Sequence, residues 1–249
     1  MSVSIPPSPP LPSLIRSHTP VQNLLHKLSY HPTTDHLIVT GDIITKGPAS
    51  GSLRTLHFLR THSTSCVRGN HDDRILLHYS QLSLPPRTLL PNTPISPAES
   101  RIRAERRLAQ RIPKADAEWL DACPLILTAE GVPALGDLAV VHAGLVPGVG
   151  LESQEPTVVM NIRSLDKEGR GRGKQGRRHW AKVWNKVEGK KENPRAVVYG
   201  HYAAKGLDIR PLTKGLDSGC AAGGRLTAMV VDAHSTKPAF VDVKCRKSS

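Results

Sequence analysis

The sequence predicts an α/β protein, and three observations support this fold class. Short apolar runs rich in Val, Ile and Leu alternate with stretches whose apolar residues recur at helical spacing. Strands and helices alternate in the first half of the chain, whereas the last part is mainly strands. A chain of 249 residues with 38% hydrophobic and 22% charged residues fits one soluble globular domain with a sizeable core.

The individual elements follow from local patterns. Residues 1–18 are rich in Ser and Pro, and we expect a disordered tail there, followed by a domain over residues 19–249. The Pro-rich stretch 85–97 breaks regular structure, and Pro113 separates two helices. Helices are expected at 21–28, 53–60, 72–79, 104–112, 114–122 and 179–187. Strands are expected at 36–40, 65–67, 125–128, 138–141, 196–199, 226–231 and 239–243.

The charge balance predicts anionic partners. The formal net charge is +13, and much of it lies in the segment 163–191, which we expect to be a basic loop insertion with the Gly-rich core Gly169–Lys174. This segment is either a solvated surface or a rim that collects a polyanion. Aromatic residues make up only 4% of the chain and none lies in that core, so specific nucleic-acid recognition is not expected.

The cysteines and the apolar runs bear on the compartment. Cys66, Cys123, Cys220 and Cys245 are widely spaced without a CxxC pair, and we expect reduced, partly buried thiols. No apolar run is long enough to span a bilayer, so no membrane contact of this chain is expected. Residues 1–13 do not resemble a signal peptide. As given, the chain is expected in the cytoplasm.

Four short motifs indicate a metal site. Each follows an apolar run, and they occur in the order Gly41-Asp42, Gly69-Asn70-His71-Asp72, His142-Ala143-Gly144 and Gly200-His201. Taken alone, Asp42 is better explained as a turn residue and each of the two histidines as a structural histidine, whereas the Gly69–Asp72 motif, which could also cap a helix, is the strongest single signal. Side chains that follow neighbouring strands gather at one edge of an α/β sheet. We therefore predict that Asp42, Asn70, His142 and His201 bind a divalent cation, with Mn, Zn, Fe or Co all suited to these ligands.

In this order the four motifs resemble the calcineurin-like metallophosphoesterase family. The resemblance implies a four-layer α/β-β/α sandwich, two divalent metal ions and hydrolysis of phosphoesters or phosphoanhydrides. It also implies that His71 protonates the leaving oxygen and that Asp72 or Asp73 orients His71. Lys46 and Arg68 would contact substrate phosphate.

Further stretches resemble a narrower group, the fungal endopolyphosphatases, which are in turn similar to bacterial diadenosine tetraphosphatases. These stretches are Val158–Arg163, Trp180, Trp184–Lys186, Tyr199–Leu207 and Gly215–Cys220. The likeness implies polyphosphate as substrate, with a dinucleoside polyphosphate or a phosphoprotein as alternatives. Arg163 would then bind phosphate, although a plain surface arginine explains it equally well. Relatives of the fungal type carry a membrane anchor for the vacuole, so a vacuolar location is the alternative for a full-length relative.

One family motif is missing. Family members begin with a strand that ends in GDxHG and supplies two metal ligands, whereas the nearest counterpart here is Arg16-Ser17-His18. We therefore expect the sandwich to lack its first strand, the site to hold one metal instead of two, and the chain to fold poorly. An inactive pseudophosphatase that binds one metal and polyanions is the alternative to an enzyme. A basic nucleic-acid-binding protein with incidental motifs is the third hypothesis.

Overall fold

The computed structural model describes residues 19–44, 47–62, 64–82 and 96–246. The expected disordered tail, Lys46 and most of the Pro-rich stretch 85–97 lie outside these residues. The described helices are α1 (Pro20–Lys27), α2 (Ala49–Thr61), α3 (Asn70–Ser80), α4 (Pro97–Ala109), α5 (Lys114–Asp121), α6 (Pro156–Val159) and α7 (Trp180–Glu188). The strands are β1 (Ile38–Val39), β2 (Ser65–Cys66), β3 (Ile126–Val132), β4 (Gly136–Val141), β5 (Ser164–Leu165), β6 (Gly171–Arg172), β7 (Ala196–Tyr199), β8 (Asp208–Ile209), β9 (Thr213–Gly215), β10 (Arg225–Val230) and β11 (Ala239–Lys244).

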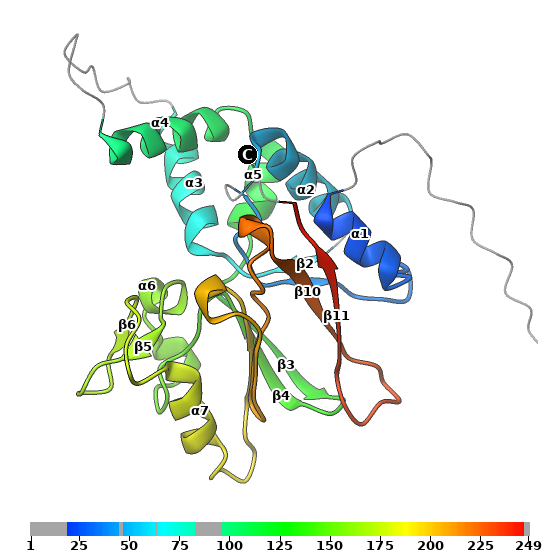
Figure 1. Cartoon of the computed structure of the whole chain (residues 1–249), viewed down its shortest axis with the longest axis vertical. Coiled ribbons are helices and arrows are strands. Elements are labelled where there is room, and N and C mark those ends of the chain that lie inside the picture. Colours follow the sequence, from blue (N-terminus) through cyan, green and yellow to red (C-terminus); the bar gives the residue numbers. More distant parts are fainter. Residues whose placement is uncertain (1–18, 45–46, 63, 83–95, 247–249) are drawn as a thin grey trace, which may run out of the picture.

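A five-stranded mixed sheet forms one half of the molecule, in the order β3-β4-β7-β9-β8 (Figure 1). The central pairs β4–β7 and β7–β9 are parallel, and the outer pairs are antiparallel. Helix α7 buries Trp180 and Trp184 in a cluster that includes Val141 and Val197 of the sheet. Because β4 and β7 are parallel neighbours, the residues that follow them, His142 and His201, leave the sheet at the same edge.

A helical half faces this edge. Strands β1 and β2 pair in parallel, and Leu56 of α2, Ile75 of α3 and Leu120 of α5 form the buried cluster beside them. Asp42 follows β1 and Asn70 follows β2. Two parallel strand pairs, one in each half, therefore direct four loops toward one place between the halves.

The remaining hairpin, β10–β11, pairs only with itself and packs against α1. Within the described residues no strand joins it to β1–β2. The expected absence of the first strand stays a prediction, because residues 1–18 lie outside the described part of the chain. Nevertheless, three clusters of buried apolar residues fill the molecule. Among the helices of the described segments, none is both long and apolar enough to cross a bilayer.

Two expectations from the sequence need correction. The segment 163–191 contains, beside the expected helix α7, a hairpin β5–β6 where we expected a loop. There Asp166 hydrogen-bonds the side chains of Arg170 and Arg172. The cysteines are not free thiols: one disulfide joins Cys66 to Cys123 and another joins Cys220 to Cys245. Partners 57 and 25 residues apart in the sequence become neighbours only through the fold, so their spacing gave no sign of pairing.

Candidate metal centre

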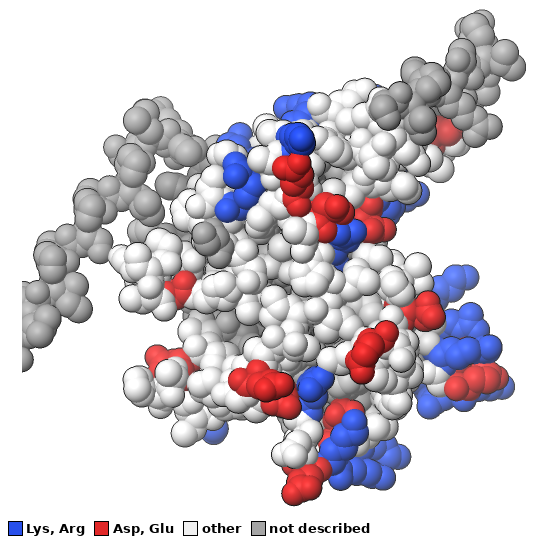
Figure 2. Space-filling view, turned by 180° about the vertical axis from the view of Figure 1, so that it is seen from behind, with Lys and Arg blue, Asp and Glu red and all other residues white. Residues whose placement is uncertain are grey.

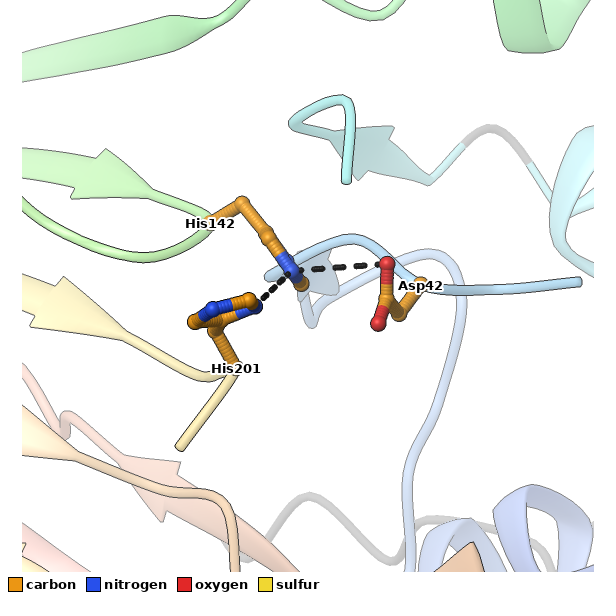
Figure 3. Close-up of side chains that lie close together, drawn as sticks. All are labelled: Asp42, His142 and His201. Atoms are coloured by element: carbon orange, nitrogen blue, oxygen red, sulfur yellow. Dashed lines mark hydrogen bonds and ion pairs between the residues drawn. The ribbon is translucent and has the colours of Figure 1, made fainter. Parts of the chain in front are cut away.

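Three of the predicted ligands lie in loops and Asn70 is the first residue of α3, and two of the ligands have unusual backbone conformations. Asp42 has φ +55° and His201 has φ +67°, in the left-handed region that non-glycine residues rarely occupy. Such conformations are costly and concentrate at functional sites, because the surrounding structure must hold them in place. The side chains of Asp42 and His201 both point toward His142 (Figure 3).

The donor atoms of the four side chains meet around Nε2 of His142. This nitrogen lies 3.2 Å from Oδ1 of Asn70, 3.1 Å from Nδ1 of His201 and 3.4 Å from Oδ1 of Asp42. Donor atoms of Asp42, His142 and His201 all lie within 4.8 Å of one another. His142 is 1% exposed, so the centre of the group is screened from bulk water.

The chemistry of this group fits a divalent cation. Nδ1 of His142 lies 2.7 Å from the carbonyl oxygen of Thr40, which can only accept, so Nδ1 carries the proton in the neutral ring. Nε2 then holds a lone pair, and it faces two further oxygen acceptors, Asn70 Oδ1 and Asp42 Oδ1. A proton on Nδ1 of His201 can bond to only one of these acceptor atoms. A cation placed among them would attract the lone pairs of all four side chains. The hydrogen bond to Thr40 also fixes the orientation of the His142 ring. A histidine that binds a metal is commonly held in this way, by an acceptor at its other ring nitrogen.

Gly69 allows the Asp42 and Asn70 loops to approach each other. A Cβ atom at Gly69 would lie 2.4 Å from both the amide nitrogen and Oδ1 of Asp42, far closer than real Cβ contacts. Gly41 meets the same loop from the other side, since its Cβ would lie 2.7 Å from the nitrogen of Gly69 and it has φ +82°. The glycines in both motifs are therefore required for the backbone contact that brings the ligands together.

Asp72 ties these two loops together. Its carboxylate, which is fully buried, accepts hydrogen bonds from the backbone N–H groups of Asp42 at 2.7 Å, Gly69 at 3.0 Å and Ile44 at 3.2 Å. Burial and the nearby charge of Asp42 raise the pKa of Asp72 to about 7, although these hydrogen bonds lower it in part. The prediction that Asp72 orients His71 is therefore replaced by a positioning role for the metal-site loops.

Arg74 occupies the place at His71 that we expected an acid to fill. Its guanidinium Nη2 donates to Nδ1 of His71 over 3.0 Å, and it also forms an ion pair with Glu105 over 2.7 Å. Because arginine only donates, the neutral His71 ring carries its proton on Nε2. That nitrogen lies 3.9 Å from Oδ2 of Asp42, at the side of the metal centre.

The three residues predicted to bind phosphate lie in different surroundings. Lys46 lies outside the described residues. Arg68 is engaged with carboxylates, since its guanidinium lies 3.0 Å from Asp121 and 3.6 Å from Asp73. The side chains of both acids are exposed, and the contact of Arg68 with phosphate stays a prediction. Arg163 lies above the ring of Tyr202, 5.4 Å from the ring centroid, directly beside the His201 loop.

Arg74 and Glu105 did not emerge as functional candidates from the sequence. Arg74 stands three residues after His71 on one helix, a spacing that places two side chains on the same face, so a helical reading of this motif could have found it. Glu105 lies on α4, more than thirty residues away, and no local signal connects it to His71.

Comparison with protein families agrees with this geometry. The model of the calcineurin-like phosphoesterases matches residues 16–227, most of the chain. The chain belongs to the calcineurin-like phosphoesterase family. Its members are hydrolases that use divalent metal ions, and the mixed α/β fold of this chain is that of the family.

Individual relatives of this phosphoesterase are similar at modest identity. A zinc-dependent endopolyphosphatase of Saccharomyces cerevisiae is 29% identical over 217 residues, which cover 78% of this chain and 66% of the yeast protein. The chain thus spans slightly less than two thirds of that relative. A symmetrical bis(5'-nucleosyl)-tetraphosphatase of Pseudomonas putida is 28% identical over 252 residues, covering 86% of this chain and 85% of the relative.

Solved structures agree with the fold. The crystal structure of a candidate diadenosine tetraphosphatase is 27% identical, has a TM-score of 0.69 and covers 90% of this chain and 87% of its own. A metallophosphoesterase from Sphaerobacter thermophilus, 12% identical with a TM-score of 0.51, covers 91% and 84% and shows the fold alone.

Proposed function

We propose that this chain is a metal-dependent hydrolase of phosphoanhydride bonds and that polyphosphate is its substrate. One observation carries the proposal: Asp42, Asn70, His142 and His201 direct their donor atoms at one point, next to the protonated Nε2 of His71. The yeast relative, named a zinc-dependent endopolyphosphatase, supports the choice of substrate and favours zinc among the candidate metals manganese, zinc, iron and cobalt.

The four ligands would hold the cation. A bound divalent cation supplies Lewis acidity to a phosphate oxygen and lowers the pKa of water, the potential nucleophile. Asp42 presents Oδ1 to this position and Oδ2 toward His71, so the carboxylate lies between the cation and the acid group. Only four ligands are available within the described residues, which favours one metal ion over the two of the family.

His71 would direct its Nε2–H at the leaving phosphate oxygen, and the proton itself can pass to that oxygen only from the doubly protonated ring. Arg74 holds the ring in the tautomer with the proton on Nε2, and Glu105 holds Arg74 in turn. Arg163, above Tyr202, would attract a further phosphate oxygen of the polyphosphate substrate. Each of these assignments follows from a contact between side chains and predicts a loss of hydrolytic activity when the residue is replaced.

Two other functions have an observation in their favour. The similarity to bis(5'-nucleosyl)-tetraphosphatases favours a dinucleoside polyphosphate, whose anhydride bonds need the same groups. The absence of an Asp-x-His motif before Asp42 favours a binding protein that holds one metal and a polyanion without turnover. The same assay separates these possibilities from our proposal.

The test is polyphosphate shortening on gels, with purified protein and added Mn, Zn or Co, beside diadenosine tetraphosphate as a second substrate. We expect metal-dependent shortening of polyphosphate that falls about 10²–10⁴-fold in His71→Ala, the usual contribution of a general acid. His234→Ala, at an exposed histidine in the β10–β11 turn, is the matched control. Metal binding without turnover by the folded protein would refute the enzyme, and preferential cleavage of the dinucleotide would refute the substrate.

A further inference from the structure

Helix α7 carries a regular row of cations on its exposed side. Lys182 and Lys186 lie four residues apart within α7 and therefore on one face of it, and Arg178 and Lys190 flank the two ends of the helix. All four are exposed. Lys and Arg side chains gather at the edge of the molecule where β5, β6 and α7 lie (Figure 2). We call this row the α7 stripe.

The acidic side chains near the α7 stripe pair with basic residues outside it, so the stripe has no counterions among the described residues. Asp166 bonds the side chains of Arg170 and Arg172, and the buried Glu188 pairs with Lys191. Arg178 donates to the backbone carbonyls of Asp166 and Lys167, not to a carboxylate. In the part of the chain that the structure describes, no acid lies within ion-pair distance of Lys182, Lys186 or Lys190. Like charges four residues apart destabilise a helix, so this arrangement is unfavourable without an external anion.

The direction of the helix strengthens this argument. Cations near a helix C-terminus, such as Lys186 and Lys190, interact favourably with the helix dipole. Arg178 and Lys182 lie instead at the N-terminal end, where the dipole is positive and the first turn contains no acidic residue. The helix dipole therefore explains the positions of Lys186 and Lys190 but not those of Arg178 and Lys182. The two cations at the N-terminal end favour a bound anion.

The stripe borders a hollow in the surface. Arg178, Lys186 and Lys190 line this hollow together with Val183 and Val187, and its volume is about 570 Å³. The nine residues of α7 span about 14 Å at the helical rise of about 1.5 Å per residue, and Arg178 and Lys190 extend the row beyond both ends of the helix. A linear anion with regularly repeated charges fits such a hollow better than a single small anion. No aromatic side chain lines it, so bases of a nucleic acid would have nothing on which to stack.

The N-terminal end of α7 lies beside the metal centre. The ring of His179 stacks on Tyr202, with ring centroids 5.8 Å apart, and Tyr202 directly follows the ligand His201. Trp180 packs against Gly144, two residues after the ligand His142, so closely that a Cβ atom there would lie 2.2 Å from the indole. The stripe thus begins next to the loops that carry two metal ligands and runs away from them.

We propose that the α7 stripe is a second anion-binding site, which holds a length of linear polyphosphate outside the metal centre. The proposal rests on the proposed function for the identity of the anion. It predicts a dependence on chain length: a polyphosphate long enough to reach the stripe binds more tightly than triphosphate, which occupies the metal centre alone.

The test measures binding and needs no turnover. Fluorescently labelled long-chain polyphosphate is titrated with the full chain in EDTA, and anisotropy gives the affinity at several salt concentrations. In the variant Lys182→Gln/Lys186→Gln/Lys190→Gln we expect binding about tenfold weaker, the loss for three partly solvated charge contacts. The matched control is Arg101→Gln/Arg103→Gln/Arg107→Gln on α4, which removes the same number of exposed charges elsewhere. Its affinity should change little.

Equal losses in both variants would overturn the proposal, because they would reflect overall charge and not a site. Unchanged binding in the α7 variant would also overturn it. Stripe-dependent binding that is tighter for single-stranded RNA of equal charge would assign the stripe to nucleic acid instead. All six positions are exposed, and a melting curve checks that each variant is folded. If polyphosphate is not cleaved with metals but stripe-dependent binding persists, the proposed hydrolysis fails and this site stands.

Discussion

Replacement of Gly69 by alanine is expected to break the metal centre and leave the rest of the fold in place. The new Cβ atom would lie 2.4 Å from both the amide nitrogen and Oδ1 of Asp42. Real Cβ atoms essentially never approach another heavy atom to under 3.0 Å, so the two loops must separate by at least the difference of about 0.6 Å. Asp42 and Asn70, two of the four ligands, would move apart with them.

A shift of this size exceeds what a metal site tolerates. Ligand distances in well-formed sites lie within about 0.2 Å of their ideal values, so a ligand displaced by about 0.6 Å contributes little to binding. We therefore expect the metal affinity to fall at least about 10–100-fold. This is the usual effect of removing a residue that holds a metal ligand in place. The hydrogen bonds from Gly69 and Asp42 to the Asp72 carboxylate would weaken at the same time.

Isothermal titration calorimetry with Zn²⁺ and Mn²⁺ measures this loss directly. Gly51→Ala is the matched control, because a Cβ atom at Gly51 of α2 meets nothing within 4 Å. Alanine there should bind metal normally and stabilise the helix by about 0.5–1 kcal/mol. Wild-type metal affinity in Gly69→Ala would refute the reasoning, since it would mean that the loops can separate without loss of the site.

Three further predictions concern stability. Asp72→Ala leaves three backbone N–H groups without their acceptor and should cost about 3 kcal/mol in urea denaturation, roughly one for each bond; a cost near zero would contradict its positioning role. Partial desolvation raises the pKa of Asp166, but hydrogen bonds from the backbone and side chain of Arg170 and from a second arginine lower it to about 2, against 3.8 ordinarily. Because the folded pKa is depressed, this carboxylate stabilises the β5–β6 hairpin above about pH 4, and the contribution is lost toward pH 2. The protection of the hairpin amides, measured relative to their intrinsic exchange rates, should therefore fall over this range and should not fall in Asp166→Asn. Reduction of Cys66–Cys123, which closes a loop of 57 residues, should cost about 4 kcal/mol in the loop-entropy description, and a melting temperature unchanged by reductant would contradict it.

Much of the secondary structure could be predicted because the local signals were strong. The capping box of Thr19 and Gln22 begins α1 within one residue of the expected helix, and the apolar runs before Asp42 and Asn70 are strands. The short strands β5, β6, β8 and β9 were missed, because two or three residues carry no periodicity. Their existence depends on the neighbouring strands that they pair with.

The convergence of Asp42, Asn70, His142 and His201 could also be predicted, since each follows a strand and parallel strands end at a common edge. Their surroundings could not. That Arg74 contacts His71, that Asp72 holds backbone amides and that Arg68 is paired with Asp121 all depend on side-chain directions and on packing between distant segments.

The sequence by itself determined the fold class, the order of the motifs, the identity of the ligand atoms and the spacing of the cations on α7, because each depends on residue type and short-range pattern. Only the tertiary structure decided which cysteines pair, which acids neutralise which bases and which cations remain without a counterion. These features depend on distances between residues far apart along the chain. Such distances are set by the packing of the two halves against each other, which no local pattern records.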